Sequence, residues 1–175
     1  MTAVSGAVLT AAQWNTHVRD NLLESPAAKA TVANQLIVST GANAIEARTV
    51  GSVSGVGSGT TNVVSEAYAD IVPSMTVTVT TGTRALVLLK AVIKVTGAGA
   101  IAYRVSGATT IAGDDTHSVV VDIFSSPTSL IWIPGASVHW ITLTPGVNTF
   151  TLQFKTFPGG GNLNMNWIDL IVIPF

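Results

Sequence analysis

The sequence contains no cysteine and few charged residues. The absence of cysteine from all 175 residues excludes disulfide bonds, thiol nucleophiles and thiolate metal sites. Charged residues make up 10% of the chain, against about 25% in an average soluble domain. The 8 basic and 9 acidic residues leave a net charge of −1, and no basic stripe suggests nucleic-acid binding. Because so little charge favours association, we expect copies of the chain or a larger assembly to cover part of its surface; the alternative is a slightly apolar monomer.

Long hydrophobic runs are also missing. No apolar run reaches the roughly 18 residues that a membrane span requires. The first ten residues, Met1–Thr10, lack the positively charged start of a secretory signal. We therefore expect a protein that is made in a cytoplasm, does not insert into a membrane and does not leave the cell by the general export route.

One helix is predicted near the N-terminus, beginning at Thr10 and ending at Ser25–Pro26. Thr10 and Gln13 have the spacing of a capping box, in which each side chain bonds the backbone of the other. Leu9 and Trp14 occupy the two positions of a hydrophobic staple. These signals fix the start of the helix more firmly than its end.

The predicted helix carries one apolar stripe. Trp14, Val18 and Leu22 recur every four residues. A helix of about 14 residues is marginal alone in water, so the stripe needs an apolar surface to lie on. We predict that this segment attaches the protein to a partner through Leu9, Trp14, Val18 and Leu22. The alternative is that the stripe packs on the protein's own β-domain.

The segment 27–60 differs in composition from the rest of the chain. Two short strands are predicted on either side of a turn at Gly41–Asn43, and the glycine- and serine-rich stretch 51–59 predicts a flexible linker. We therefore predict an N-terminal region over 1–60, with an attachment helix, an extended arm and a Gly/Ser linker, followed by a β-domain over 61–175.

The β-domain is predicted from alternating apolar and polar residues. In the stretch 84–95 the odd positions are all apolar, whereas three even positions are Arg84, Lys90 and Lys94. Glycine and proline punctuate the sequence, and Pro134–Gly135 is predicted to be a turn. About eight strands with no helix between them predict a mostly β protein with an antiparallel jelly-roll β-sandwich.

Two stretches resemble a known family. Val8–Leu23, which reads VLTAAQWNTHVRDNLL, resembles the N-terminal segment of many tailed-bacteriophage and prophage structural proteins. Asn43–Arg48 is similar to a phrase that often follows in those proteins. Leu143–Gly146 and Phe150–Phe154 resemble the end of the small jelly-roll heads on phage fibres, which are related in architecture to the tumour-necrosis-factor fold.

The resemblance implies a non-enzymatic virion structural protein, either a short fibre or a decoration knob, assembled in the host cytoplasm. Its implied partners are capsid or tail proteins and two further copies of itself in a homotrimer. No heptad or collagen-like repeat that could form a shaft is present. If three heads converge, the strand faces Val119–Ile123 and Phe150–Phe154 are predicted to line their shared axis. The alternative is a carbohydrate- or receptor-binding head on the same particle.

Asp114, Asp115 and His117 are the candidate residues for a metal or catalytic site. Two carboxylates beside an imidazole could hold a divalent cation, but calcium-loop spacing is missing and a solvated turn is the commoner structure. A polysaccharide hydrolase is a third hypothesis, although no serine lies in a nucleophile elbow. We predict no catalytic residue, no metal site and no cofactor. His139 is expected at a surface or an interface.

Aromatic residues are the best candidates for ligand recognition. Exposed tryptophan and tyrosine stack on sugars and anchor protein interfaces. Tyr103, Trp140 and Phe157 are the predicted ligand contacts, with a host surface glycan as the candidate ligand. Phe157 precedes the loop 158–161 and is expected to be the most exposed. The alternative for each of these residues is packing in the core.

Overall fold

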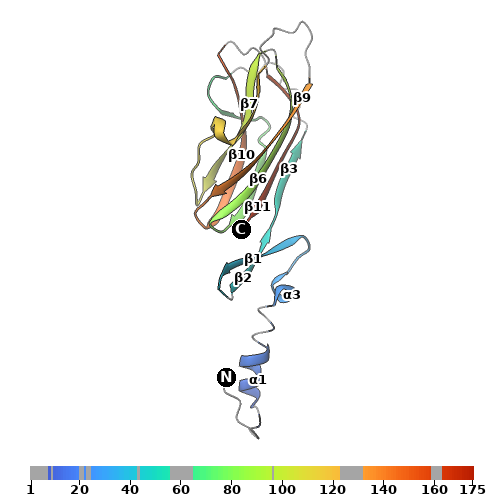
Figure 1. Ribbon diagram of the computed structural model, residues 1–175, viewed down its shortest axis with the longest axis vertical. Helices are drawn as coiled ribbons and strands as arrows, with labels where there is room; N and C mark the ends of the chain where they lie inside the picture. Colours follow the sequence, from blue (N-terminus) through green and yellow to red (C-terminus); the bar gives the residue numbers. More distant parts are fainter. Residues whose placement is uncertain are drawn as a thin grey trace. The chain divides into compact units, whose positions relative to one another are not determined.

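The computed structural model describes residues 8, 10–19, 22, 25–42, 44–55, 65–95, 97–122, 132–158 and 163–175 (Figure 1). The chain divides into two compact units, an N-terminal unit over Met1–Arg48 and a β head over Thr49–Phe175. No helix among these residues is long and apolar enough to cross a membrane.

The N-terminal unit begins with the predicted capping box. The Gln13 amide donates to the hydroxyl of Thr10 at 3.2 Å, and the Thr10 amide donates to Gln13 Oε1 at 3.0 Å. The α-helix that follows, α1 (Ala11–Trp14), is short, because the chain continues as a π-helical segment, η1 (Asn15–Arg19). Leu9 of the predicted staple lies outside the described residues.

Ser25–Pro26, the predicted end of the first helix, begins a second helix. The Ser25 carbonyl accepts hydrogen bonds from the backbone amides of Ala28 and Lys29. These bonds begin the helix α3 (Pro26–Lys29). Proline is tolerated at the first helical position because its missing N–H would have had no partner there. After α3 the strands β1 (Gln35–Gly41) and β2 (Ala44–Thr49) form a two-stranded sheet on either side of the predicted turn.

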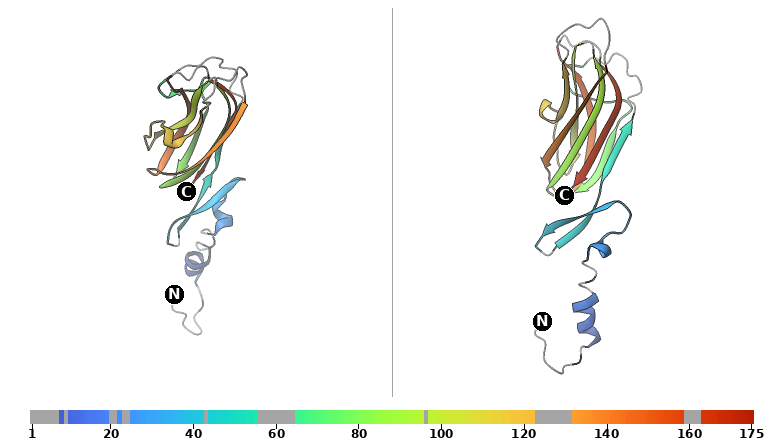
Figure 2. Two further views of the ribbon diagram at one scale, coloured as in Figure 1. Left: turned by 45° about the horizontal axis from the view of Figure 1, so that its top comes forward. Right: turned by 45° about the vertical axis from the view of Figure 1, so that its right-hand side comes forward.

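The β head consists of two antiparallel sheets, which Figure 2 shows stacked face to face. Sheet I has the order β3 (Gly51–Gly55), β11 (Leu163–Pro174), β6 (Arg84–Val95) and β9 (Trp132–Thr142). Sheet II joins β4 (Ala69–Asp70) and β5 (Thr76–Thr81) to β10 (Gly146–Thr156), which is followed by β7 (Ala98–Gly107) and β8 (Ser118–Asp122).

The strand pairing is that of a jelly roll. The first strand of the head, β3, pairs with the last, β11; β5 pairs with β10, β6 with β9, and β7 with β8. This pairing from the outside inward arises when one long hairpin folds over itself into two sheets. Because β4 and β5 pair with successive stretches of β10, they act as one interrupted strand. The predicted antiparallel jelly-roll sandwich of about eight strands is confirmed.

Part of the predicted linker belongs to the head. Residues Gly51–Gly55 form β3, in which Val53 pairs with Leu170 of β11. Glycine suits this strand, because a Cβ at Gly51 would overlap the side chains of β5 beneath it. The boundary between the units therefore falls after Arg48 and not at residue 60. The remainder of the predicted linker lies outside the described residues.

The core lies between the two sheets. The odd positions of β6 from Ala85 to Ile93 are buried, as their alternation predicts. Val119 and Val121 of β8 point into the same core, as do Phe150, Leu152 and Phe154 of β10. The prediction that these two strand faces line an oligomer axis is therefore wrong, since they pack within one head; Ile123 lies outside the described residues.

Pro134–Gly135 is not a turn, because β9 continues through it. Pro134 pairs with Val92 and Gly135 with Ala91 of β6. Proline is compatible with a strand at the edge of a sheet, where one side needs no ladder hydrogen bond. A Cβ at Gly135 would overlap Val119 of β8. The glycine thus lets the edge of sheet I approach the edge of sheet II.

Candidate interaction surface

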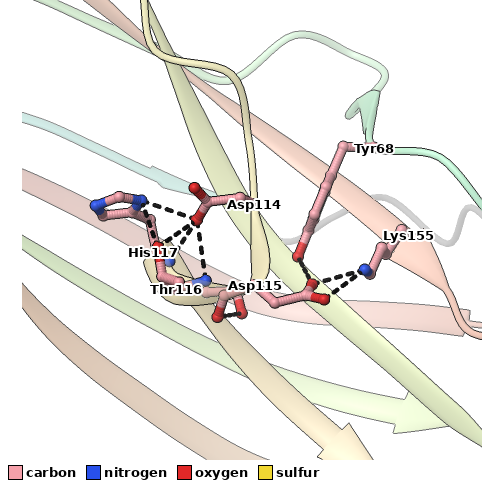
Figure 3. A network of polar contacts seen from close by, with 7 residues as sticks. Tyr68, Asp114, Asp115, Thr116, His117 and Lys155 are labelled. Carbon is pink, nitrogen blue, oxygen red and sulfur yellow. Dashed lines mark hydrogen bonds and ion pairs between the residues drawn. The ribbon is translucent and has the colours of Figure 1, made fainter.

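The predicted chemical residues form a closed hydrogen-bonded turn. Asp114 precedes the 3₁₀ helix η2 (Asp115–His117), and its Oδ1 accepts hydrogen bonds from the backbone amides of Thr116 and His117 at 2.9 and 3.0 Å (Figure 3). The same oxygen lies 2.9 Å from His117 Nδ1. Burial would raise the pKa of Asp114, but the hydrogen bonds from Thr116 and His117 outweigh it and lower this pKa.

Asp115 points to different partners. Its carboxylate accepts a hydrogen bond from Tyr68 Oη at 2.7 Å and pairs with Lys155 Nζ on β10 at 2.6 Å. Lys155, followed by Tyr68, lowers the pKa of the Asp115 carboxyl. Burial, with the hydrogen bond to Asp115, raises the pKa of Tyr68. The network therefore fastens the η2 turn to sheet II.

This arrangement gives no sign of a cation site. The carboxylates of Asp114 and Asp115 engage separate partners, so their oxygens do not converge with His117 on one point. Within the described ranges, no group of three or more His, Asp or Glu residues could hold a metal ion. The network has the character of the polar turn that was the commoner alternative.

A cluster of aromatic and imidazole rings packs against His117 of the η2 turn. The ring of His117 meets the ring of His139 from β9 edge-on, at a centroid distance of 5.5 Å and an interplanar angle of 75°. Tyr103 of β7 contacts both rings, at 5.9 and 5.7 Å, and Phe150 at 5.9 Å. Burial, followed by the charge of His117, lowers the pKa of His139. His139, expected at a surface or interface, faces the interior and links sheet I to sheet II.

Within the described part of the chain, two polar atoms of this cluster have no partner. Tyr103 Oη and His139 Nδ1 are buried without a hydrogen bond. Tyr103 is 0% exposed, and burial raises the pKa of its phenol. Its prediction as a ligand contact is wrong, because the alternation of β7 turns this ring inward against Phe150.

The other two predicted ligand contacts differ in exposure. Trp140 on β9 is 53% exposed, and its ring lies 5.0 Å from that of Phe175. Phe157, expected to be the most exposed, follows β10 and is half-buried. Lys155 Nζ lies 4.4 Å from the centroid of its ring. Of the three predicted contacts, Trp140 is the most accessible.

Trp140 belongs to a large apolar face, the outward side of sheet I. Val138 beside it is 63% exposed. The outward apolar residues, which are half-buried or exposed, are Leu86, Leu88, Val92, Trp132, Val138, Trp140, Ile171, Ile173 and Phe175. The charged residues on this face are Arg84, Lys90, Lys94 and Asp169. Arg84 and Lys94 lie over the rings of Trp140 and Trp132, and Lys90 pairs with Asp169 at 3.2 Å. Hydrogen bonding to Ser54, together with Lys90, lowers the pKa of Asp169.

The outward side of sheet I is also hollowed. A cavity of about 450 Å³ lies over β6 and β11, with Leu88, Val138 and Ile171 among its apolar lining residues. The Lys90–Asp169 pair and the hydroxyls of two β3 serines line it as well. An apolar hollow with a few polar groups can receive a side chain of a partner or a small ligand.

The outward side of sheet II is polar by contrast. Arg104 donates two hydrogen bonds to Asp70, at 3.0 and 2.8 Å, and Gln153 donates a third at 2.8 Å. The hydroxyls of Thr78 and Thr149 lie 2.9 Å apart. The two faces of the sandwich therefore differ: sheet II satisfies its own polar groups, whereas sheet I leaves apolar side chains in contact with solvent.

The sequence contained a signal for the apolar face that strand alternation alone did not reveal. Leu86–Leu89 and Leu170–Ile173 are apolar at both odd and even positions. Such continuous runs are typical of strands covered on both faces. The even positions of β6 and the odd positions of β11 after its bulge point away from the core, so these runs mark a second face that needs cover.

Comparisons with known proteins yield only distant structural similarities. No family model and no curated protein matches the chain. Eiger TNF from S. frugiperda is 11% identical, with a TM-score of 0.48 over 71% of this chain and 85% of that chain. The Arthrobacter globiformis T6 isomalto-dextranase complexed with panose is 16% identical, with a TM-score of 0.36 over 79% of this chain and 21% of that chain. At these scores neither similarity carries an argument about function.

Proposed function

We propose that this protein is a non-enzymatic structural protein of a tailed-phage particle, a short fibre or decoration knob. The N-terminal unit attaches it to capsid or tail proteins, and the jelly-roll head is displayed as a homotrimer. The resemblance of Val8–Leu23 to phage structural proteins supports the attachment role. The exposed apolar side of sheet I supports association between heads.

The observation that carries the proposal is the exposure of the N-terminal helix. The segment α1 buries none of its residues, and Trp14 is 54% exposed. Leu22 is 63% exposed, and Val18 of the same stripe is half-buried. Large apolar side chains on a capped helix favour burial against a partner, by roughly 2 kcal/mol for each fully buried side chain.

Attachment is tested by co-sedimentation with particles assembled without the protein. The variant with Trp14→Ser and Leu22→Ser loses two apolar anchors, so we expect its binding to fall at least tenfold, since about 1.4 kcal/mol corresponds to tenfold in affinity. Deletion of residues 1–30 should abolish binding. The control Val32→Ser changes an exposed apolar residue of the same unit outside the stripe and should bind normally. Undiminished binding of the deletion variant would refute the attachment role.

Association between heads is supported by the size of the apolar face. Strands about 4.8 Å apart, four in sheet I with β9 11 residues long, give a face of about 19 by 36 Å. This is close to the roughly 800 Å² per partner of a standard interface. The net charge of the whole chain is −1, so copies of it do not repel each other strongly at long range.

A carbohydrate-binding head is the second candidate function. It is favoured by two exposed tryptophans on sheet I, Trp132 and Trp167. Trp167 has a positive φ of 43° at a bulge in β11, and bulges commonly re-aim a side chain. Binding to a microarray of oligosaccharides that is lost in Trp132→Ala and Trp167→Ala would support this function. No binding to any oligosaccharide would leave the structural role as the better account.

A further inference from the structure

The contact between His117 and His139 joins one edge of sheet I to the neighbouring edge of sheet II. His117 directly precedes β8, the edge strand of sheet II, and His139 lies on β9, the edge strand of sheet I. No ladder hydrogen bond joins β8 to β9, since they belong to different sheets. The ring cluster and the close approach at Gly135 and Val119 hold these edges together.

The cluster contains one carboxylate for two imidazoles. Asp114 Oδ1 is engaged by His117 Nδ1 and by the amides of the η2 turn. His139 Nδ1 is buried and has no acceptor. A proton on His139 would therefore leave an N–H without a partner in a desolvated place, and burying such a charge is unfavourable. The same proton would stand beside the imidazole of His117.

We propose that His117 and His139 form an acid-sensitive clasp between the β8 and β9 edges of the head. The clasp is closed while His139 is neutral and its ring packs edge-on against His117. It opens when His139 is protonated, because the proton on the buried Nδ1 has no acceptor and the neighbouring carboxylate, Asp114, is already engaged by His117. The β8 and β9 edges then separate while the rest of the sandwich stays folded.

Among the described residues, the groups around His139 leave no other charge to compensate its proton. From the η2 turn it faces His117 and Asp114, and from β7 it faces the phenol of Tyr103. Its partner on β6 is Val87, and the β8 and β10 side chains of this core are the apolar Val119 and Phe150. Asp115 is held by Tyr68 and Lys155 on the outer side of sheet II.

The direction of the pH effect follows from the lowered pKa of His139, whose causes are burial and then the charge of His117. Because the unfolded chain takes up the proton first, below about pH 6.5, the clasp loses stability as the pH falls from there toward the folded-state pKa. Above about pH 6.5 both states are neutral and no effect is expected. The acidic groups with lowered pKa values, Asp70, Asp114, Asp115 and Asp169, act only near and below about pH 4.

The test is hydrogen exchange of the full-length protein between about pH 7.5 and about pH 5. We expect the protection factors of β8 and β9 amides to fall about tenfold for each unit by which the pKa of His139 lies below the unfolded value. Amides in the pairing of β5 with β10 should keep their protection. His139→Gln should remove the pH dependence, whereas His17→Gln, in the N-terminal unit, should retain it.

Three results would overturn the clasp: constant protection of β8 and β9 in the wild-type protein, an unchanged pH dependence in His139→Gln, or its loss in His17→Gln. If His139→Gln does not fold, NMR titration of the wild-type imidazole signals decides. The ring of His139 should then titrate below its ordinary value, together with the loss of protection. The clasp lies within one head, so the test does not depend on attachment. Because β9 belongs to the sheet proposed to associate, the amides of β8, on the other sheet, report on the clasp independently of trimer formation.

Discussion

At the scale of single residues, Asn148 is the most consequential polar side chain of the head core. It is completely buried, and its Nδ2 donates to Thr81 Oγ1 at 2.8 Å and to the Thr144 carbonyl at 3.1 Å. Its Oδ1 accepts a hydrogen bond from the Thr109 amide at 2.8 Å. One amide thus joins the end of β5 to two connecting segments, each of which would otherwise leave a polar group unsatisfied.

We predict that Asn148→Ala lowers the free energy of unfolding by about 3 kcal/mol, because buried groups that lose their partner cost about 1–3 kcal/mol each. The adjacent Thr149→Ala is the control. It removes one hydroxyl bonded to Thr78 near the surface and should cost about 0.5 kcal/mol. Urea unfolding measures both, and equal losses for the two variants would contradict the role given to Asn148.

At the scale of elements, the contact between the edges of β8 and β9 depends on a missing side chain. A Cβ at Gly135 would overlap Cγ1 of Val119, and Val119 is buried in the core. Overpacking a core by one methyl group typically costs 1–3 kcal/mol. The glycine therefore has a steric reason to lie in the middle of a strand, where it would otherwise weaken the sheet.

We predict that Gly135→Ala lowers the free energy of unfolding by about 2 kcal/mol. In a Val119→Ala background, where space is available for the new methyl group, the same substitution should cost less than about half as much. A double-mutant cycle measured by urea unfolding decides between steric overlap and backbone effects. Strict additivity of the two substitutions would show that the overlap is not the cause.

At the scale of the whole molecule, the contrast between the two outer faces predicts how heads associate. Sheet II pairs Asp70 with Arg104 on its own surface, whereas sheet I exposes Val138 and Trp140. Exposed apolar faces of this extent commonly mark an interaction site. Association through sheet I would bury these side chains and its hollow together.

We predict that Val138→Glu converts a homotrimer of the full-length protein to monomers at micromolar concentration, because an unpaired carboxylate would be buried in the contact. Thr80→Glu adds the same charge to an exposed position on sheet II and should leave the trimer intact. Light scattering after size-exclusion chromatography gives the mass of each variant. A monomeric wild-type protein would refute the homotrimer itself, whereas a trimeric Val138→Glu would refute only this face.

Local patterns determined much of the fold. The capping box at Thr10 and Gln13 is formed by residues three apart, so it can be predicted from the local sequence. Alternation with period two placed Ala85, Val87 and Leu89 on a buried strand face, because a strand turns successive side chains to opposite sides. These features, with the glycine and proline punctuation, were sufficient to predict an antiparallel jelly-roll sandwich.

Tertiary structure alone decided what each strand face meets. Alternation assigns Tyr103 and Trp140 to faces of their strands but does not say that one face is the core and the other is open. Sequence also could not bring His117 and His139 together, because their contact depends on two sheets stacking face to face, so that the edge strands β8 and β9 meet. The physical reason is that backbone geometry is local, whereas burial and pairing are set by segments far apart in the chain.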